Sequence, residues 1–484
     1  MRRSMRRLCF LAVAGGSAMI LAVAPPAFAA SVVVVSGPSP YANCSNDAQS
    51  GTNYVNAEVE PYVSVNPTNT SNLVGVWQQD RWSDGGAHGL VAGFSFDGGA
   101  TWGETTLPFS QCANGLGYER ASDPWVSFGP DGTAYTVSIS FNDTNNNNAV
   151  AAATSTDGGR TWQRLSVLIA DNEPSLQFFN DKESVTADPT KPGTAYVVWD
   201  RLEEPNANPD ANLRTAAFRG PALFSKTTNG GRTWGSPKVI VNTPSRQQTI
   251  GNQVVVDPRN GALYDFFDLI TPPFNVTAFK LAFVKSTDGG NTWTKPKVIA
   301  NMQTVGVTDP NTGEAVRTGD IIPEPAIDAA TGQLYVVWQD SRFNGGHFDE
   351  VAISTSTNGG ATWSVPKQVN TNTPATRPGF TPMVAVNSAG QVAVTYYDFR
   401  NLTTQTDTLP TDYWISFSSD HGATFGNEQH ITGPFDMKTA PNAGGFFVGD
   451  YEGLSVAGTT FESFFVAANS GNIANRTDVF AASF

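Results

Sequence analysis

The sequence contains little cysteine and little histidine, with three Cys and four His in 484 residues. A structural zinc site needs three or four such ligands grouped at short spacings, and no group of this kind occurs. A His-rich zinc centre is not expected either. We therefore expect no metal and no organic cofactor, and the one alternative is structural calcium held among carboxylates.

Long apolar runs are also scarce, and the one that occurs stands at the start of the chain. Four arginines within the first seven residues precede the apolar run 8–24, and the small-x-small sequence 27–29 follows it. This order is typical of a secretory signal peptide over residues 1–29, and retention of the run as an anchor is the alternative. No later stretch is long enough to span a bilayer. We expect a secreted, extracellular protein without a membrane span after signal removal.

Basic residues are outnumbered, with 29 Lys and Arg against 43 Asp and Glu. The signal peptide carries four arginines and no acidic residue, so its removal moves the net charge from -14 to -18. Such a surface repels phosphate backbones, and nucleic acid is not expected as a partner. An anionic sugar would have to bind where arginines are concentrated locally.

Two cysteines remain when Cys9 leaves with the signal peptide. In an exported chain, two cysteines favour a disulfide, here between Cys44 and Cys112. The bond would tie an N-terminal arm, residues 30–58, to the end of the first repeat.

The sequence is rich in repetition, because one octapeptide of the form Ser-x-Asp-Gly-Gly-x-Thr-Trp recurs. Its Asp or Asn can accept hydrogen bonds from nearby backbone amides, and its glycines supply the positive φ of a tight hairpin. The Thr and the aromatic residue then begin the next strand. These features predict a structural rather than a catalytic role. The copies span residues 95–102, 155–162, 227–234, 286–293, 356–363 and 418–425.

Each octapeptide follows short apolar segments that complete a unit of four strands, and no amphipathic helix is evident. Units repeating every 59 to 72 residues predict an all-β fold, a β-propeller of four-stranded antiparallel blades over residues 59–484. Six octapeptides give six blades, and residues 451–484 begin a seventh that lacks its outer strand. The run 31–36 in the arm is available to fill that place. A six-bladed ring with a leftover C-terminal segment is the alternative.

One face of such a propeller collects the starts of first strands and the ends of second strands, and it is rich in carboxylates and arginines. The first-strand starts are Glu60, Asp123, Glu183, Asn252, Glu324 and Glu452. The second-strand ends carry the pairs Asp80–Arg81, Asp200–Arg201, Asp340–Arg342 and Asp398–Arg400. These pairs could bind a ligand, or they could be ion pairs that brace neighbouring blades.

The octapeptides and the strand pattern resemble the sialidase family and its Asp-box (BNR) relatives over nearly the whole chain after the signal peptide. The resemblance implies an arginine triad that binds the substrate carboxylate, a Tyr nucleophile activated by a Glu, and an Asp acid/base. A neutral phenol would not be repelled by that carboxylate, and guanidinium groups would bind it through charge-assisted hydrogen bonds.

The resemblance assigns the catalytic roles to residues of three blades. Glu324 opens a first strand and would activate the nucleophile, and Tyr451 stands where the nucleophile would be. Asp84, in the loop after the second strand of the first blade, is the acid/base candidate, and Asp80 is the second choice.

The resemblance also assigns the substrate-binding arginines. Arg342 and Arg400 take two triad places, and Arg81 is the further candidate at a second-strand end. At the first-blade position where the family has its first Arg, this chain has Glu60.

These features predict a secreted exo-sialidase-like glycoside hydrolase that removes terminal acidic sugars from glycans. The alternatives are a non-catalytic propeller that binds carbohydrate or a surface, and another carbohydrate-active reaction on the same frame. We expect a glycan as ligand and a monomer.

Overall fold

In the computed structural model, the described residues are 31–45, 49–172, 178–203, 219–272, 278–371 and 377–484. They form strands with two short 3-10 helices, η2 (Arg342–Asn344) and η3 (Met437–Thr439). The part of the chain with described positions contains no helix that is long and apolar enough to cross a membrane. The predicted signal peptide, residues 1–29, lies outside the described residues.

Most strands belong to four-stranded antiparallel units that follow one another along the chain. The first unit contains β2 (Asn53–Val65), β3 (Leu73–Trp82), β4 (Ala87–Ser95) and β5 (Gly103–Leu107). The second contains β6 (Arg120–Phe128), β7 (Ala134–Phe141), β8 (Asn148–Ser155) and β9 (Gln163–Asp171). One pairing, Ala87 with Ala121, joins these two units into an eight-stranded sheet.

The next units are separate four-stranded sheets. The third contains β10 (Phe178–Ala187), β11 (Ala195–Glu203), β12 (Ala222–Thr227) and β13 (Lys238–Val241). The fourth contains β14 (Gln248–Val256), β15 (Leu263–Ile270), β16 (Lys280–Ser286) and β17 (Lys297–Asn301). The fifth contains β20 (Glu324–Ile327), β21 (Leu334–Asp340), β22 (Glu350–Ser356) and β23 (Lys367–Gln368). The sixth contains β24 (Gly379–Val386), β25 (Val392–Asp398), β26 (Pro410–Ser418) and β27 (Gly426–Asp436).

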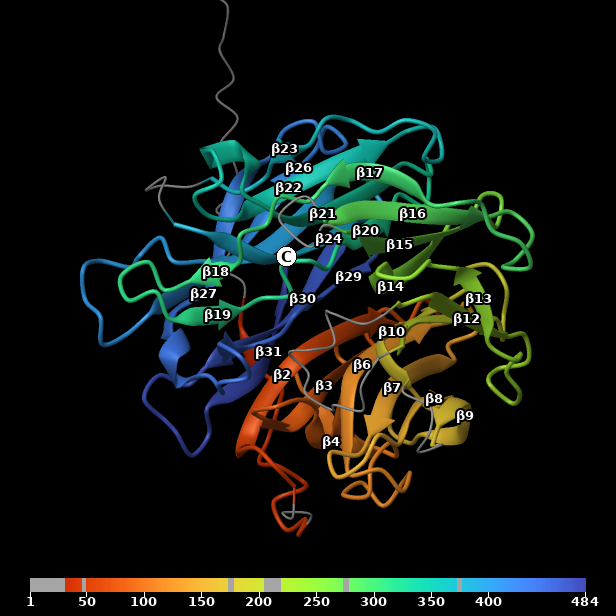
Figure 1. Cartoon of the computed structure of the whole chain (residues 1–484), viewed down its shortest axis with the longest axis horizontal. Coiled ribbons are helices and arrows are strands. Elements are labelled where there is room, and N and C mark those ends of the chain that lie inside the picture. The colour runs from red at the N-terminus through yellow and green to blue at the C-terminus, as the bar shows by residue number, and fades with distance from the viewer. Residues whose placement is uncertain (1–30, 46–48, 173–177, 204–218, 273–277, 372–376) are drawn as a thin grey trace, which may run out of the picture.

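The last unit is built from both ends of the described chain. It contains β29 (Gly453–Ala457), β30 (Thr460–Ala468), β31 (Thr477–Ser483) and the N-terminal strand β1 (Val33–Val34), which pairs antiparallel with β31. The residue run 31–36 therefore supplies a strand to this sheet. Strand β2 of the first unit contacts β29, β30 and β31, so the units form a closed ring around a common centre, as in a β-propeller (Figure 1).

A small three-stranded sheet belongs to none of the ring units, and Figure 1 shows its strands β18 and β19 to the left of the centre. It contains β18 (Val307–Thr308) and β19 (Ala315–Arg317), which come between the fourth and fifth units, and β28 (Phe446–Phe447), which comes before the last. Strands β19 and β28 pair in parallel. The insertion therefore places Arg317 beside Phe447, close to the centre of the ring.

Large aromatic side chains of the second strands fill the space between units. Trp77, Trp199 and Trp338 occupy matching places in β3, β11 and β21, and each is fully buried. A buried tryptophan removes roughly 150–250 Å² of surface from water, so these positions contribute strongly to the packing of sheet on sheet.

The octapeptide turns lie between third and fourth strands and are held by the side chains that their sequence predicts. The Asp97 carboxylate accepts hydrogen bonds from the Thr101 amide (2.9 Å) and hydroxyl (2.6 Å), and the Ser95 hydroxyl accepts one from the Gly99 amide (2.9 Å). The same contacts recur around Asp157, Asp288 and Asp420. The turns therefore fix the outer hairpin of the units that carry an octapeptide.

The second glycine of an octapeptide can also contact the preceding unit. Gly159 has a φ of +94°, and a Cβ there would lie 2.6 Å from a methyl group of buried Val74 in β3. Gly99, at the same place in the first octapeptide, has a φ of +84° and no atom nearer than 3.8 Å to such a Cβ.

We expect Gly159→Ala to destabilise the protein more than Gly99→Ala. Both substitutions place a Cβ on a left-handed backbone, but only the first forces a side chain into the packed neighbouring sheet, which costs about 1–3 kcal/mol. Urea denaturation of the two variants measures the difference. Equal losses of unfolding free energy would contradict the close packing at Gly159.

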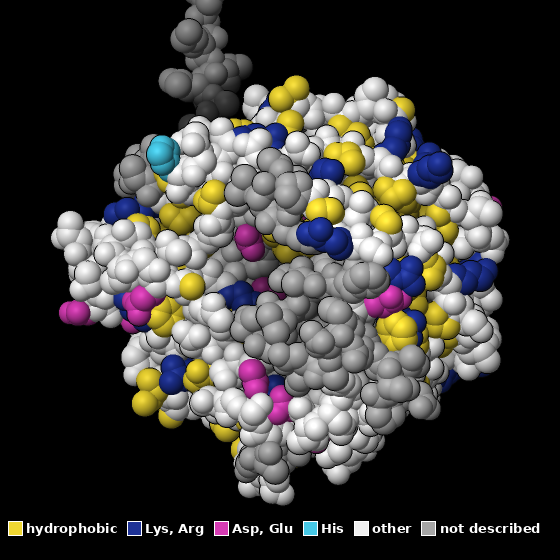
Figure 2. Space-filling model, viewed as in Figure 1, with side chains coloured by type: hydrophobic (Ala, Val, Ile, Leu, Met, Phe, Trp, Pro, Cys, Tyr) yellow, Lys and Arg dark blue, Asp and Glu magenta, His cyan; other side chains and the backbone are white. Residues whose placement is uncertain are grey.

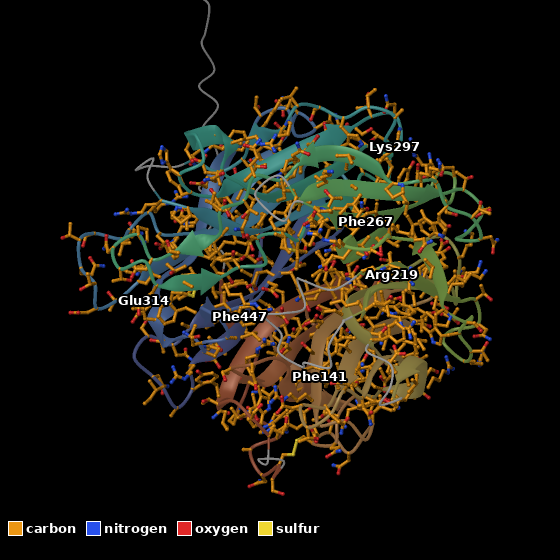
Figure 3. All side chains as sticks on the ribbon, in the orientation of Figure 1. Phe141, Arg219, Phe267, Lys297, Glu314 and Phe447 are labelled. Carbon is orange, nitrogen blue, oxygen red and sulfur yellow. A yellow bond between two sulfur atoms is a disulfide. The ribbon has the colours of Figure 1, made fainter. Side chains whose placement is uncertain are left out.

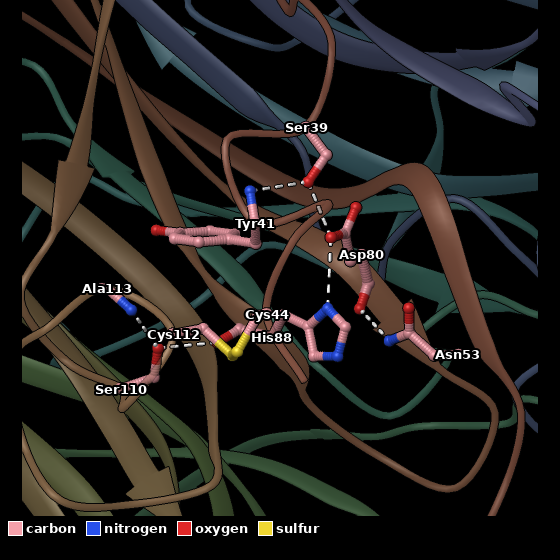
Figure 4. The surroundings of a disulfide bond; sticks show 9 residues. All are labelled: Ser39, Tyr41, Cys44, Asn53, Asp80, His88, Ser110, Cys112 and Ala113. Atoms are coloured by element: carbon pink, nitrogen blue, oxygen red, sulfur yellow. Dashed lines mark hydrogen bonds and ion pairs between the residues drawn. A yellow bond between two sulfur atoms is a disulfide. The ribbon is translucent and has the colours of Figure 1, made fainter. Parts of the chain in front are cut away.

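The N-terminal arm is fastened to the first unit by a disulfide and by hydrogen bonds (Figure 4). Cys44 and Cys112 are bonded, with their Cα atoms 5.5 Å apart, so the predicted disulfide is confirmed. The Tyr41 hydroxyl donates to the Leu90 carbonyl (2.6 Å), and the Ser39 hydroxyl donates to the buried Asp80 carboxylate (2.7 Å). These contacts hold the arm in position to supply β1 to the last sheet.

We expect the double variant Cys44→Ala/Cys112→Ala to lose up to about 4 kcal/mol of unfolding free energy, because the bond closes a loop of 68 residues in the unfolded chain. Urea denaturation with and without reductant tests this. The reductant should lower the stability of the native protein and leave the double variant unchanged; a double variant as stable as the oxidised protein would refute the expectation.

Candidate functional site

A cavity of about 390 Å³ lies at the centre of the ring, within the size range of small-ligand pockets. Figure 2 shows the molecule hollowed there, with charged side chains inside the hollow. Its walls come from strands of the first four units, from the loop after β3, and from the small sheet and the segments beside it. The charged residues that line it are Arg81, Asp123, Asp181, Lys182, Arg317, Asp320 and Asp450.

Backbone bulges in the innermost strands bring charged residues to this centre. Glu60 in β2, Asp123 in β6 and Lys182 in β10 have φ values of 52°, 52° and 47°, and the strand register shifts beside each of them. Gly251 in β14 and Thr381 in β24 repeat the feature. A bulge re-aims a side chain, and a left-handed backbone costs a non-glycine residue about 1–3 kcal/mol. The fold therefore keeps a strained backbone at Glu60, Asp123 and Lys182, the residues whose charges meet at the centre.

Lys182 is surrounded by three carboxylates. Its ammonium lies 2.9 Å from Asp450, 3.1 Å from Glu60 and 3.4 Å from Asp123. Burial works against the charge of Lys182, but the three carboxylates together raise its pKa well above the usual value. Burial raises the pKa of Glu60 to about 8 despite the attraction of Lys182. Lys182, Asp123 and Asp450 therefore form the ionised part of this cluster at neutral pH.

Asp450 has a second cation. The Arg317 guanidinium donates to both Asp450 oxygens, with Nε 3.0 Å from Oδ1 and Nη2 2.5 Å from Oδ2. Burial alone would raise the pKa of Asp450, but Arg317 and Lys182 hold it well below its usual range. Asp450 is thus a fixed negative charge between two cations.

Among the described residues that line the cavity, Arg81 is the cation without a carboxylate in contact. It is 2% exposed, its Nη1 donates to the Gln78 side chain (2.7 Å), and its Nε has no hydrogen-bond partner among the described residues. Its guanidinium and that of Arg317 lie 4.9 and 4.4 Å from the centre of the Phe447 ring, which Figure 3 labels near the middle of the molecule. Burial, and then Arg317, lower the pKa of Arg81 to about 10, so it stays charged at neutral pH.

Tyr451 is enclosed behind this cavity. Its hydroxyl donates to the Pro124 carbonyl (3.3 Å), its ring packs against Trp125 at 5.0 Å, and the Lys182 ammonium lies 5.5 Å from the ring centre. Burial, and then the Glu60 carboxylate, raise the pKa of Tyr451 well above its usual value. The phenol is therefore neutral, and Tyr451 is buried outside the set of residues that line the main cavity.

Glu324 lies in the same buried centre. One of its oxygens has no hydrogen-bond partner in the described structure, and burial raises its pKa to about 8. Tyr62 stands near both predicted residues, since its ring meets that of Tyr451 edge-on at 6.5 Å and the Glu324 charge raises its pKa after burial. The Tyr451 hydroxyl donates to Pro124 and not to Glu324.

The two acid/base candidates of the first unit have other partners. The Asp84 carboxylate accepts from Arg120 (2.7 Å) and from the Ser50 hydroxyl (3.0 Å), while the following Gly85 and Gly86 line the cavity. Asp80 is fully buried under the N-terminal arm.

Arg342 and Arg400 are outside the residues that line the cavity and are held by their own units. Arg342 donates to both oxygens of Asp340, each at 2.7 Å, and to the carbonyl of Asn301 in the preceding unit. Arg400 donates to Asp398 and Glu428, both at 2.6 Å. Arg342 and Arg400 therefore link neighbouring strands, and Arg342 also links neighbouring units. Of the three predicted arginines, Arg81 is the one that the structure brings to the cavity.

Sequence reasoning did not single out Lys182, Arg317, Asp320 or Asp450. Lys182 precedes the predicted Glu183 by one residue, and the bulge in β10 decides which of the two faces the centre. The other three come from segments outside the four-stranded units, where the repeat gives no register.

Comparisons with known proteins agree with this architecture. A Hadza microbial sialidase superposes with a TM-score of 0.50 at 15% identity, over 87% of this chain and 75% of that one. An α-L-arabinofuranosidase from Fusarium graminearum gives 0.45 at 15% identity over 72% and 92%, and a mutant Trypanosoma rangeli sialidase with trans-sialidase activity gives 0.45 at 14% over 78% and 57%. No protein-family profile and no curated protein sequence matches the chain. The chain has a sialidase-like β-propeller fold.

We expect Lys182→Met to destabilise the protein by about 3–5 kcal/mol, because it leaves buried carboxylates without their cation. Lys191→Met is the matched control, since the Lys191 side chain is exposed and its buried partner Asp188 also accepts from the Tyr196 and Thr190 hydroxyls, so we expect a loss of at most about 1 kcal/mol.

The loss in Lys182→Met should depend on pH. Without the cation, the pKa values of Asp123 and Asp450 rise in the folded state, so the penalty is largest at neutral pH and shrinks as the pH falls and these groups are protonated. Urea denaturation at pH 5 and pH 8 measures this, and a loss that is equal at both values would contradict the proposed ion cluster.

Proposed function

We propose that this protein is a secreted carbohydrate-active hydrolase that binds a terminal acidic sugar of a glycan in the central cavity and cleaves it, as exo-sialidases do. The observation that carries the proposal is Arg81, a buried cation at the cavity wall without a carboxylate in contact. A buried donor left unpaired costs about 1–3 kcal/mol, and an anionic ligand would remove that cost.

The neighbours of Arg81 support a carboxylate as the anion. Arg317 lies on the same Phe447 ring and is partly exposed, so the two guanidinium groups could approach one carboxylate from different sides. Guanidinium groups bind carboxylates through short, charge-assisted hydrogen bonds. Local cations would then attract an acidic sugar despite the negative charge of the whole chain.

The chemistry that we propose keeps the roles implied by the family resemblance. Tyr451 would attack the anomeric carbon, and Glu324 would take its proton. Tyr451 is buried and does not line the main cavity, so this route requires Lys182, whose ammonium lies 5.5 Å from its ring, to shift when the sugar binds. A neutral phenol avoids the repulsion that a carboxylate nucleophile would meet from an acidic sugar.

We also propose a ring of seven blades and export of the protein. Seven units have four strands, counting two in the joined sheet and the last unit that β1 completes. The leader sequence and the Cys44–Cys112 bond both suit an oxidising extracellular setting.

A second function, glycan binding without hydrolysis, is favoured by the surroundings of Tyr451. Its hydroxyl is bonded to Pro124 and its ring is packed against Trp125. If Lys182 does not move, Arg81 and Arg317 would still bind an acidic sugar while the nucleophile stayed out of reach.

The first test is hydrolysis of a fluorogenic sialoside by the purified mature protein. We expect turnover that is lost in Tyr451→Phe and that falls about 10- to 100-fold in kcat/KM in Arg81→Met, the effect of one hydrogen bond to a charged group. Arg201→Met is the matched control, because Arg201 has the same place at the end of β11 and is held by Asp171 (2.9 Å).

Binding of a sialyl oligosaccharide, measured by calorimetry, separates the two functions. Binding without turnover that weakens in Arg81→Met, with Arg201→Met unaffected, would replace hydrolysis by recognition. A folded protein that neither binds nor cleaves the sugar would reject both.

A further inference from the structure

A second group of polar side chains meets at the wall of the cavity, on the side of the small sheet. Thr304 follows β17, Asp320 lies in the turn before β20, and Asp349 immediately precedes β22. The Thr304 hydroxyl oxygen lies 2.7 Å from Asp320 Oδ2 and 2.6 Å from Asp349 Oδ2. Asp320 lines the cavity, whereas Thr304 and Asp349 are buried behind it.

The hydrogen atoms available to this group are too few for two ionised carboxylates. A threonine hydroxyl has one hydrogen, and the Thr304 oxygen already accepts from the Gly306 amide (3.2 Å). It can therefore donate to Asp320 or to Asp349, but not to both. The remaining contact would bring two oxygen atoms together without a hydrogen between them, unless that carboxyl is protonated and donates to Thr304. The pair holds at least one proton.

The surroundings decide how the two carboxyls hold the proton. Asp349 accepts from the Val305 amide (2.9 Å) and from the Gln339 side-chain amide (3.1 Å). The Gln339 oxygen accepts from the Thr381 amide (2.9 Å), which fixes its NH₂ group toward Asp349. Both Asp349 oxygens thus receive donors, an arrangement that favours the ionised form. These donors favour the ionised form of Asp349 against its burial, which raises the pKa of Asp349 to about 7, so the two carboxyls share the one proton. When Asp320 holds it, Asp320 donates to Thr304 and Thr304 donates to Asp349.

The charges around Asp320 act in both directions. Burial and then the negative charge of Asp450 raise its pKa, while the Thr304 hydrogen bond and Arg317 lower it, and the net change is upward. Asp268, a buried group on β15, is a further acidic neighbour, with its own pKa raised by burial and by Asp320. Burial raises the pKa of Asp349 to about 7.

We propose that Asp320 and Asp349 share one proton through Thr304, and that Asp320 is the catalytic acid of the cavity. This assignment depends on the proposed hydrolase function. Asp320 gives its proton to the glycosidic oxygen as the bond to the anomeric carbon breaks, so the leaving group departs as a neutral alcohol. The water that completes hydrolysis returns a proton to Asp320. Thr304 and Asp349 are positioning residues, because they act through Asp320.

Asp320 suits this role better than Asp84 for a geometric reason. The Asp84 carboxylate is 2.7 Å from the Arg120 guanidinium and also accepts from the Ser50 hydroxyl, so its oxygens are engaged by donors. The Thr304 and Asp349 pair instead supplies Asp320 with an acceptor for its proton.

The test compares two sialosides that differ in their leaving group. An aryl sialoside releases a phenolate that needs no proton, whereas a sialyl oligosaccharide releases an alkoxide that does. We expect Asp320→Asn to lower kcat/KM on the oligosaccharide by about 10²–10⁴-fold, the usual contribution of a general acid, and to leave kcat/KM on the aryl substrate within about tenfold, because kcat/KM reports the departure of the leaving group and not the later attack of water. Equal losses on both substrates, or none on either, would overturn the assignment.

The positioning role of Thr304 is tested by the pH profile. Thr304→Val removes the hydroxyl that links the two carboxyls, so the basic limb of the kcat profile should shift. Thr304→Ser keeps the hydroxyl and should keep the limb in place. A basic limb that is the same in Thr304→Val and the native protein would refute the shared proton.

Infrared spectroscopy separates this proposal from the function on which it depends. At neutral pH the difference spectrum between the native protein and Asp320→Asn should contain a protonated-carboxyl C=O band, because the bands of other protonated carboxyls such as Glu60 and Glu324 cancel. If the native protein cleaves neither sialoside, the catalytic assignment falls with the proposed function, and the band alone decides whether the proton is shared. The absence of any difference in this band overturns the proposal even if the enzyme is active.

Discussion

The centre of this protein depends on the ion cluster around Lys182. One ammonium from the third unit contacts Glu60 of the first, Asp123 of the second and Asp450 just before the last, so it joins the beginning and the end of the ring. The charges of Lys182, Asp123 and Asp450 would each be costly to bury alone, and their mutual attraction offsets much of that desolvation cost. The strained bulges of β2 and β6 persist because this cluster, and the sheets around it, leave Glu60 and Asp123 no better position.

The pairing of charges within this cluster determines which cation of the cavity can bind a ligand. Lys182 and Arg317 are both engaged by Asp450, whereas Arg81 is not in contact with any carboxylate in the described structure. The cavity therefore presents a positive group although the chain carries a net charge of -14. Local geometry, and not the total charge, decides which sign of ligand the centre favours.

The repeat could be predicted from the sequence because it is enforced by local chemistry. Asp97 and its counterparts hold their turns through atoms within four residues, and Cys44 had a single partner after Cys9 was assigned to the leader. The cavity could not be predicted in the same way. A one-residue bulge exchanges Glu183 for Lys182, and the segments that carry Arg317 and Asp450 have no counterpart in the repeat from which a register could be read.

The second-strand arginines illustrate why a repeated motif is a poor guide to a site. Arg81 and Arg201 follow an aspartate at the same place in their strands, yet Arg201 is neutralised by Asp171 from the unit before it. At Arg81 the space is taken by the small sheet, which brings Phe447 and Arg317 in place of a carboxylate. The repeat places an arginine at both positions. At Arg81 the neighbours from the insertion are Phe447 and Arg317, and neither neutralises its charge, which is why Arg81 is the proposed ligand-binding group.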